Sequence, residues 1–309
     1  MIGTVTGPGG TGAVSGNGPA AGVPSRLPDT LPAWRALLDR IEVRPSKGMG
    51  QNFLLDRSVI GRIVAEAEIG PGDTVIEIGP GLGILSEGIL ATGAHLTAIE
   101  LDAKLAAQLF VTFGDLDRFR LVEADALSVA TETLVPGERP FTVVANLPYS
   151  VATAILRHLL EQSHRPRRLV LMVQKEVAER ITATPPRLSI LGVAARLYTE
   201  PRIVFTVPPD VFFPPPAVES AVVVLDVHDR VQVEGEERAL FFTIVSAGFQ
   251  QKRKQLANSL ADTLALPKAE VVAWLGAAGI APDRRAQTLS VPEWLAVNAR
   301  RPASIVSRR

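Results

Sequence analysis

The sequence predicts an α/β protein with a small all-helical part at its C-terminal end, and three observations lead to this prediction. Between residues 74 and 173, short apolar stretches rich in β-branched residues alternate with stretches of helical spacing. Such alternation is typical of a parallel sheet with right-handed crossovers. The first of these strands runs directly into a glycine turn. After residue 235 the pattern is helical throughout.

The glycine turn follows the predicted strand Thr74–Ile78, whose apolar residues suit burial on both faces of a sheet. The turn contains three alternate glycines, Gly79, Gly81 and Gly83. Glycine accepts positive φ and lets a ligand approach the backbone closely. A helix that begins after the turn would present its free N–H groups to that ligand. We interpret this corner as a nucleotide-binding site, and a tight turn without a ligand is the alternative.

The glycine pattern of the turn differs from the fingerprint of dinucleotide-binding proteins. That fingerprint needs a glycine at its sixth position, where this chain has Ile84. An acid, Glu77, precedes the first glycine by two residues. The resulting E-x-G-x-G-x-G pattern resembles the first motif of S-adenosylmethionine-dependent methyltransferases.

The part of the chain before the glycine turn divides into a tail and two helices. Residues 1–28 are rich in Gly, Pro and Ala and have almost no large apolar side chain, so we expect a flexible tail. Apolar spacing predicts helices over Thr30–Ile41 and about Ser58–Glu68. A glycine-bearing loop, Lys47–Asp56, connects them.

Four further strands are predicted after the glycine turn: His95–Glu100, Phe119–Glu123, Phe141–Ala145 and Leu169–Val173. Parallel sheets of this kind bind ligands at the carboxyl ends of their strands. Polar residues stand at three of these ends, namely Glu100, Asp125 and Asn146. We therefore expect these three side chains to gather at one edge of the sheet.

The later part of the chain changes from strands to helices. Two β-rich segments, 202–207 and 220–227, flank a proline-rich loop that should be stiff, because proline fixes φ. Four helices are then predicted: Leu240–Phe249, Gln251–Leu260, Lys268–Ala277 and Pro292–Asn298. We place a domain boundary near residue 230, with one domain over 29–230 and a helical domain over 231–309.

Charge and composition restrict the function. Residues 250–309 contain ten Lys and Arg against four Asp and Glu, and this excess predicts an anionic partner for the helical part. The chain has no cysteine and four scattered histidines, so we expect no disulfide, thiolate or metal site. No apolar run reaches the ~18 residues of a membrane span. No secretory signal is apparent at the N-terminus, and we expect a cytoplasmic protein.

The acids at the strand ends suit a nucleoside ligand. Glu100 can accept hydrogen bonds from two ribose hydroxyls, as acids in dinucleotide folds do; an ordinary strand-end acid is the alternative. Asp125 can accept a hydrogen bond from an adenine amino group. Asp is also a favoured helix N-cap, and the two roles are compatible.

The stretch Asn146-Leu147-Pro148-Tyr149 suits methylation of an exocyclic amine, whose lone pair is delocalised into the ring. The Asn146 side-chain oxygen and a carbonyl of Leu147 or Pro148 could accept both N–H protons and so free that lone pair. Tyr149 offers a face for base stacking, typically worth ~1–3 kcal/mol. The base must leave its stack to reach such a pocket. A proline turn with a core tyrosine is the alternative.

In order along the chain, these features resemble the ribosomal RNA adenine N6-dimethyltransferase family. The residues that carry the resemblance, which runs from about Pro45 to Leu295, are Gln51–Leu54, Glu77–Gly83, Glu100, Asp125, Asn146–Tyr149 and the loop Pro208–Ser220. The helical part, with Gly248–Lys254 and Asn258–Leu260, resembles the branch that acts on small-subunit (16S) rRNA. The macrolide-resistance methyltransferases of large-subunit RNA are close relatives that differ in this part. Gln287 stands where that branch is expected to have Glu, which affects nothing catalytic.

The resemblance implies a Rossmann-like class I fold that uses S-adenosylmethionine as its methyl donor. It implies that two adjacent adenosines near the 3′ end of 16S rRNA receive four methyl groups, within the small ribosomal subunit, and we expect a monomer. The competing functions are a non-catalytic small-subunit assembly factor, a 23S rRNA adenine methyltransferase of the macrolide-resistance type and an NAD-linked oxidoreductase. The implied cofactor residues are Asn52, Leu54, Gly79, Gly81, Glu100, Asp125 and Asn146.

The same resemblance implies the residues that receive the target base. Asn146, Leu147 and Pro148 would hold the amine, while Tyr149 and Phe212 would stack on the flipped adenine from opposite sides. Phe213 follows Phe212 directly, so either phenylalanine could stack on the adenine. The position in the motif favours Phe212. The run Lys252–Lys254 is either a phosphate contact or a solvated helix face.

Overall fold

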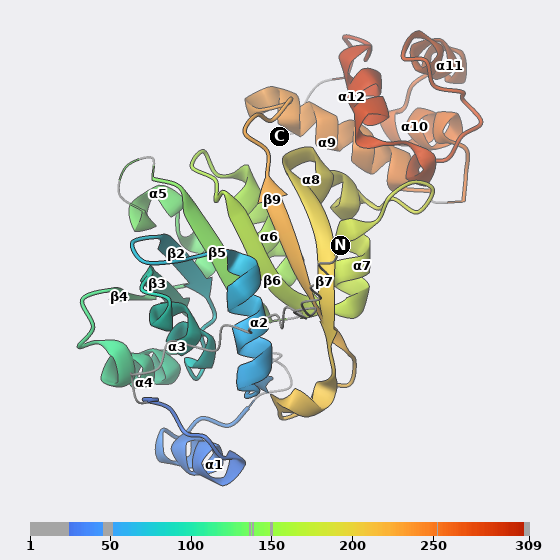
Figure 1. Cartoon of the computed structure of the whole chain (residues 1–309). Helices are drawn as coiled ribbons and strands as arrows, with labels where there is room; N and C mark the ends of the chain where they lie inside the picture. The colour runs from blue at the N-terminus through green and yellow to red at the C-terminus, as the bar shows by residue number, and fades with distance from the viewer. Residues whose placement is uncertain are drawn as a thin grey trace, which may run out of the picture.

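A computed structural model of the chain describes residues 25–45, 52–135, 137, 139–148, 151–251 and 253–305 (Figure 1). A seven-stranded sheet lies at its centre. The strands are β2 (Thr74–Ile78), β3 (His95–Glu100), β4 (Phe119–Glu123), β5 (Phe141–Asn146), β6 (Arg168–Gln174), β7 (Thr199–Val207) and β9 (Ser220–Val227). Their order in the sheet is β4-β3-β2-β5-β6-β9-β7. The five strands predicted from residue 74 to residue 173 are confirmed to within one residue at each end.

The sheet is mixed, and its five strands between residues 74 and 174 are parallel, as the alternation of strands and helices predicted. Strands β4, β3, β2, β5 and β6 pair in parallel, whereas β9 pairs antiparallel with both β6 and β7. The cause is the connection from β7 to β9, which holds no crossover helix of the length that a parallel return needs. The chain therefore reverses, and β9 inserts between β6 and β7.

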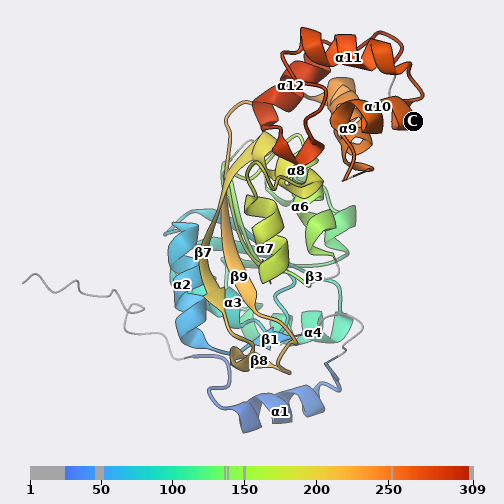
Figure 2. The same ribbon diagram turned by 90° about the vertical axis from the view of Figure 1, so that its right-hand side faces the viewer.

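Helices cover both faces of the sheet (Figure 2). They are α2 (Arg57–Ala67), α3 (Ile84–Ala91), α4 (Ala103–Phe113), α5 (Thr131–Leu134), α6 (Ala152–Glu161), α7 (Lys175–Thr182) and α8 (Ile190–Tyr198). Helix α1 (Leu31–Arg40) lies away from the main sheet. Neighbouring residues of a strand face opposite sides, and the core divides accordingly. Val144 packs in a cluster with α1 to α4, while Val143 packs in another with α6 to α8. The alternation read from the sequence thus becomes a three-layer core.

Caps and glycines fix where the helices next to the sheet edge begin. The Asp56 carboxylate accepts the Ser58 N–H at 2.8 Å and caps α2, and Asp102 caps α4 in the same way. Gly83 precedes α3 with φ of +86°. A Cβ at this position would lie 2.7 Å from the Phe113 ring. Glycine is therefore required here both for its conformation and for the packing of α4 against the turn.

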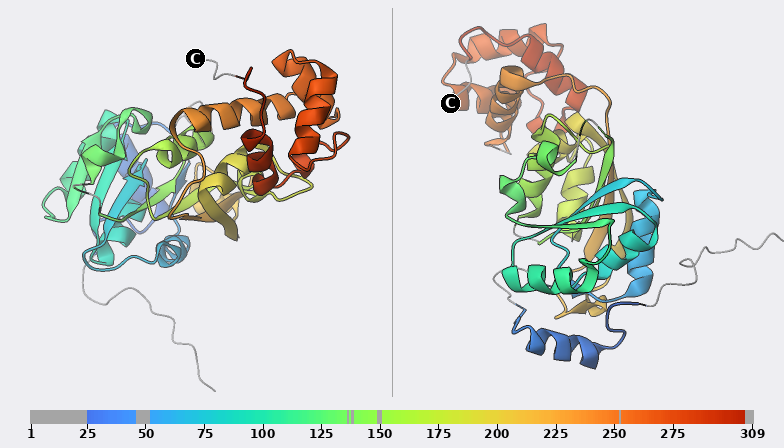
Figure 3. Two further views of the ribbon diagram at one scale, coloured as in Figure 1. Left: turned by 90° about the horizontal axis from the view of Figure 1, so that it is seen from above. Right: turned by 90° about the vertical axis from the view of Figure 1, so that its left-hand side faces the viewer.

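A helical region follows β9 at the opposite end of the molecule from α1 (Figures 1 and 3). It consists of α9 (Gly235–Phe249), α10 (Leu256–Leu264), α11 (Lys268–Ala277) and α12 (Val291–Ala299). Ser290 and Glu293 form a capping box at the start of α12. The apolar cluster under α6 to α8 continues into this region through Phe241 and Ile244, so the two parts share one core. All four predicted helices are present, although α9 begins five residues earlier and α10 five residues later than expected.

Several features were not predicted. Helices α7 and α8 lie in a stretch for which no element was assigned, and β1 (Phe53–Leu54) pairs with β8 (Phe212–Phe213) in a short antiparallel ribbon. The end of the expected tail is held in place, because Leu27 is buried and the Arg26 N–H donates to the Glu87 carboxylate. Within the described part of the chain, no helix is long and apolar enough to cross a membrane.

Candidate active site

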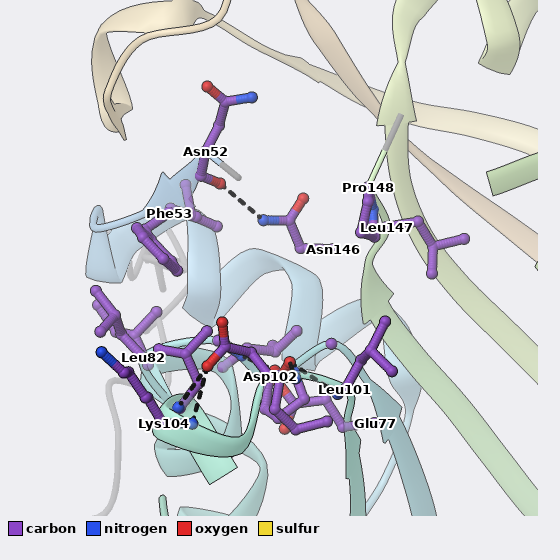
Figure 4. A pocket seen from close by; sticks show the side chains of 18 of the residues that line it. Asn52, Phe53, Glu77, Leu82, Leu101, Asp102, Lys104, Asn146, Leu147 and Pro148 are labelled. Carbon is purple, nitrogen blue, oxygen red and sulfur yellow. Dashed lines mark hydrogen bonds between the residues drawn. The ribbon is translucent and has the colours of Figure 1, made fainter. Parts of the chain in front are cut away.

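A cavity of about 690 Å³ opens at the carboxyl ends of β2, β3 and β5 (Figure 4). Four segments far apart in the sequence form its walls: 52–54 around β1, 79–82 in the glycine turn, 100–105 after β3, and 146–148 after β5. Parallel strands bring their ends to one edge, which is where α/β sheets bind ligands. The predicted location of the site is thus the location of the cavity.

The cavity brings together most of the residues singled out in the sequence. Those that line it are Asn52, Leu54, Gly79, Gly81, Glu100, Asn146, Leu147 and Pro148. Asp125 and Phe212 do not line it. Tyr149 lies outside the described residues, as do Gln51 and Lys252, so their predicted roles are not addressed by the structure.

The floor of the cavity is bare backbone. Gly79 and Gly81 have φ of +66° and +58°, a backbone conformation that residues with a Cβ rarely adopt. A Cβ on Gly81 would lie 3.2 Å from the Phe53 ring. The turn therefore leaves backbone surface free for close approach by a ligand.

Glu100 ties the glycine turn to the end of β3. Its carboxylate accepts N–H bonds from Gly81 at 3.0 Å, Leu101 at 2.9 Å and Asp102 at 3.0 Å. Burial raises the pKa of Glu100, and these N–H donors oppose the rise because they stabilise the charged form. The acid is thus fixed at the rim of the cavity, and its remaining lone pairs can accept further hydrogen bonds.

Glu77 is a second acid of the site, and no role was assigned to it from the sequence. It is 1% exposed, its Oε2 accepts the Ser86 hydroxyl at 2.5 Å, and its Oε1 has no partner among the described residues. Burial raises the pKa of Glu77 to about 8; the Ser86 bond lowers it, and the charge of Glu100 raises it. A buried carboxylate oxygen without a partner costs free energy, which a cationic ligand group in this cavity would recover. The acid two residues before the first glycine was the sequence signal for this residue.

Asn146 stands at the end of β5, which is held between β2 and β6. Its Nδ2 donates to the Asn52 carbonyl at 3.5 Å, so the side chain is oriented across the cavity toward β1 (Figure 4). The Leu147 N–H donates to the Met172 carbonyl at 3.0 Å. This bond fixes the backbone from which Pro148 continues along the cavity wall.

Asp125 adopts the capping role that was the alternative for it. Its carboxylate accepts the Leu127 N–H at 2.9 Å and caps the 3₁₀ turn Ala126–Ser128 after β4. The residue stands at the same sheet edge as Glu100, but outside the lining of the cavity. Adenine recognition by Asp125 stays a prediction.

The ribbon of β1 and β8 joins the cavity to the proline-rich loop. Phe53 pairs with Phe213, and Leu54 pairs with Phe212. Phe212 is 5% exposed and packs in the same cluster as Leu54, whereas Phe213 is half-buried under the Arg35 guanidinium at 5.2 Å. Stacking of either phenylalanine on a base stays a prediction.

Comparison with known proteins identifies the family. The family model described as "Ribosomal RNA adenine dimethylase" matches residues 44–300. The chain belongs to this family. It is therefore an S-adenosylmethionine-dependent methyltransferase of ribosomal RNA, and the resemblance read from its motifs is confirmed.

Curated relatives extend over nearly the same region. "Ribosomal RNA small subunit methyltransferase A" of Dehalococcoides mccartyi strain CBDB1 is 39% identical over 86% of this chain and 92% of that protein. The protein of the same name from Moorella thermoacetica is 43% identical over 82% of this chain and 91% of its own length.

Solved structures agree on the fold. The 23S rRNA methyltransferase ErmE has a TM-score of 0.64 and 28% identity, and the match covers 81% of this chain and 99% of ErmE. A dimethyladenosine transferase from Plasmodium falciparum has a TM-score of 0.67 at 22% identity, over 78% and 94% of the two chains. The family assignment excludes the NAD-linked alternative.

Three features of the cavity fit the family's cofactor. The glycine floor lets the cofactor lie close to the protein backbone. Glu100 can accept hydrogen bonds from the ribose hydroxyls, and the Oε1 of Glu77, which has no partner among the described residues, can contact a positively charged group. S-adenosylmethionine supplies an electrophilic methyl group on a sulfonium when it is bound. The protein has to orient that group and present an amine to it.

Proposed function

We propose that this protein is the 16S rRNA (adenine-N6,N6)-dimethyltransferase. It places four methyl groups on two adjacent adenosines near the 3′ end of 16S rRNA, in the small ribosomal subunit. The observation that carries the proposal is the position of Asn146, Leu147 and Pro148 at the edge of a cavity floored by glycines. The names of relatives with about 40% identity support the small subunit as the substrate.

In this proposal the cofactor is held by residues from three strand ends and from the segment before α2. Gly79 and Gly81 contact it from below, and Glu100 accepts the ribose hydroxyls. Asp125, already a cap, receives the adenine amino group. Asn52 and Leu54 close over the methionine end.

The target amine is activated by acceptors rather than by a base. The Asn146 Oδ1 and a carbonyl of Leu147 or Pro148 accept its two N–H protons, which frees the nitrogen lone pair from the ring. The main contribution of such a site is to hold the amine and the methyl group in a near-attack geometry. No strong general base is required at the start, because the amine proton becomes acidic after methyl transfer.

The second methyl transfer to each adenosine sets a further condition. A monomethylated amine keeps a single N–H, so the site must hold it while accommodating one methyl group. Stacking fixes the plane of the base independently of those protons, and each stacked base is typically worth ~1–3 kcal/mol. We assign this role to Tyr149 and Phe212, with Phe213 as the competing residue.

We propose that the chain divides by task near residue 230. Residues 29–230 carry the methyl transfer, and residues 231–309 bind RNA through their excess of Lys and Arg. The tail predicted for residues 1–28 lies outside the described residues up to residue 24. The protein acts as a monomer in the cytoplasm, where small subunits are assembled.

Methylation of large-subunit RNA is the second candidate function. The observation in its favour is the similarity to ErmE, which spans nearly all of that chain. A non-catalytic assembly factor is the third, and the intact Asn146-Leu147-Pro148 segment argues against it.

The test is methyl transfer from labelled S-adenosylmethionine to small subunits that lack the modification. Wild type and Asn146→Ala are compared, with nucleoside analysis of the RNA. We expect dimethyladenosine with wild type and a loss of roughly 100-fold or more with the variant. Binding of subunits by wild type without methylation would favour the assembly factor instead.

A further inference from the structure

Residues 25–45, which include α1, run along the outside of the molecule from α3 to the rim of the cavity. Figure 2 shows α1 beneath β1 and β8, away from the main sheet. We name this segment the brace. It lies mostly before the region matched by the family model, which starts at residue 44.

The N-terminal end of the brace is anchored to α3 and α4. The Ser25 hydroxyl and the Arg26 N–H both donate to the Glu87 carboxylate, at 3.1 and 2.8 Å. The Arg26 guanidinium donates to both carboxylate oxygens of Asp115. The Arg57 guanidinium donates to the Glu87 carboxylate and to the Ser25 hydroxyl oxygen. Several partners in one network hold a segment better than an isolated surface ion pair does.

The middle of the brace packs against the ribbon. A ribbon with two residues in each strand cannot be stable alone in water. It shares its apolar cluster with three buried side chains of α1: Trp34, Leu37 and Leu38. On the same helix, the Arg35 guanidinium lies over the Phe213 ring. The geometry of β8, and with it the position of both phenylalanines, therefore depends on α1.

The C-terminal end of the brace reaches the cavity. Lys104 lines the cavity, and its Nζ donates to the Glu42 carbonyl at 3.0 Å and to the Glu42 carboxylate at 3.2 Å. Glu42 has φ of +54°, a conformation that is uncommon outside glycine. That conformation ends α1 and directs the Glu42 carbonyl at Lys104.

We propose that the brace positions both halves of the active site, each through one residue. Arg35 is a positioning residue for β8 and hence for the target base, while the pair of Glu42 and Lys104 positions the rim that faces the cofactor. This inference rests on the proposed function for its RNA half. Its cofactor half can be tested by ligand binding alone.

The test uses the full chain with Arg35→Ala, Arg35→Lys and Lys104→Met. Arg40→Ala is the control, because Arg40 is an exposed arginine of the same helix for which the structure gives no side-chain partner among the described residues. S-adenosylhomocysteine binding is measured by calorimetry. Turnover is measured on unmethylated small subunits, and the midpoint of thermal unfolding is recorded for every variant.

The two ends should respond separately. An exposed cation–π contact corresponds to roughly 2- to 5-fold, so Arg35→Ala should lower kcat/KM for subunits by that factor, with S-adenosylhomocysteine affinity within 2-fold of wild type. Arg35→Lys should recover part of the loss. Lys104→Met should weaken S-adenosylhomocysteine binding by roughly 3- to 10-fold, the range for the net contribution of one hydrogen bond.

The proposal is overturned if Arg35→Ala behaves like Arg40→Ala on subunits, or if Lys104→Met binds S-adenosylhomocysteine like wild type. It is also overturned if each variant loses both activities in proportion to its loss of thermal stability, since that is the signature of a purely structural segment. A wild type that binds S-adenosylhomocysteine but methylates no subunits would defeat the proposed function. Lys104→Met would then still decide the cofactor half.

Discussion

The two sides of the active site are built in different ways. The floor and one wall of the proposed cofactor side come from consecutive elements, because β2, the glycine turn, α3 and β3 all lie between residues 74 and 100. The proposed base side comes from three distant segments, which meet where β1 pairs with β8 near the end of β5. A site formed by consecutive residues depends on local backbone conformation, which a sequence motif can predict. A site formed by distant segments depends on tertiary packing, which no single motif predicts.

The largest expected effect concerns Glu77, on the cofactor side. The folded protein keeps its proton up to about pH 8, while an unfolded chain releases it near 4.5. The stability from this group is therefore fully present below about pH 4.5 and is lost as the pH rises toward 8, by up to about 1.4 kcal/mol for each pH unit. Glu77→Gln should remove this slope. It should also weaken binding of the cationic cofactor, because a positive charge in the cavity favours the ionised form of Glu77, which Gln cannot adopt.

Urea unfolding of the ligand-free protein at pH 5.5, 6.5 and 7.5 measures that slope. The difference in unfolding free energy between wild type and Glu77→Gln cancels the contributions of other titrating groups. Parallel pH profiles for the two proteins would show that Glu77 is ionised in the folded state and would contradict the assignment.

A smaller effect is expected from Gly83→Ala, which tests whether backbone geometry carries the cofactor side. The positive φ and the contact with Phe113 should together cost about 2–4 kcal/mol of unfolding free energy. Gly61→Ala is the matched control, because Gly61 is an exposed glycine of α2 with open space around it. That substitution should stabilise the helix by about 0.5–1 kcal/mol. Equal effects at the two glycines would remove the argument from conformation.

The smallest effect belongs to the base side and separates the two phenylalanines. Phe212→Leu should lower kcat/KM for subunits by roughly 10-fold, within the range for loss of one base stack. Phe213→Leu, measured in parallel, should have an effect near that of Arg35→Ala, since both act on the same contact. A larger loss at Phe213 would reverse the assignment of the stacking residue.

The strands and the glycine turn of the proposed cofactor side could be predicted from the sequence. Strand and turn boundaries from Thr74 to Glu100 agree with the structure, because apolar periodicity and glycine spacing are local signals. Glu77 was visible in the motif, but the lack of a described partner for its Oε1 depends on burial by surrounding elements, which a motif does not report.

The base side and the edge of the sheet were predicted less well. Two-residue strands such as β1 and β8 carry no periodicity, so their pairing could not be anticipated. The antiparallel position of β9 follows from a connection length rather than from the composition of the strand. Asp125 was assigned two compatible roles; the structure shows the cap on the turn after β4, and adenine recognition stays a prediction.

The most direct test of the account supplies small and large ribosomal subunits, both unmethylated, in one reaction with limiting enzyme. Methylated nucleosides are then counted and located in each RNA. The account predicts dimethyladenosine at two adjacent adenosines of 16S rRNA, four methyl groups for each small subunit, and none in 23S rRNA. Methylation that falls on 23S rRNA, or on neither RNA, would contradict it.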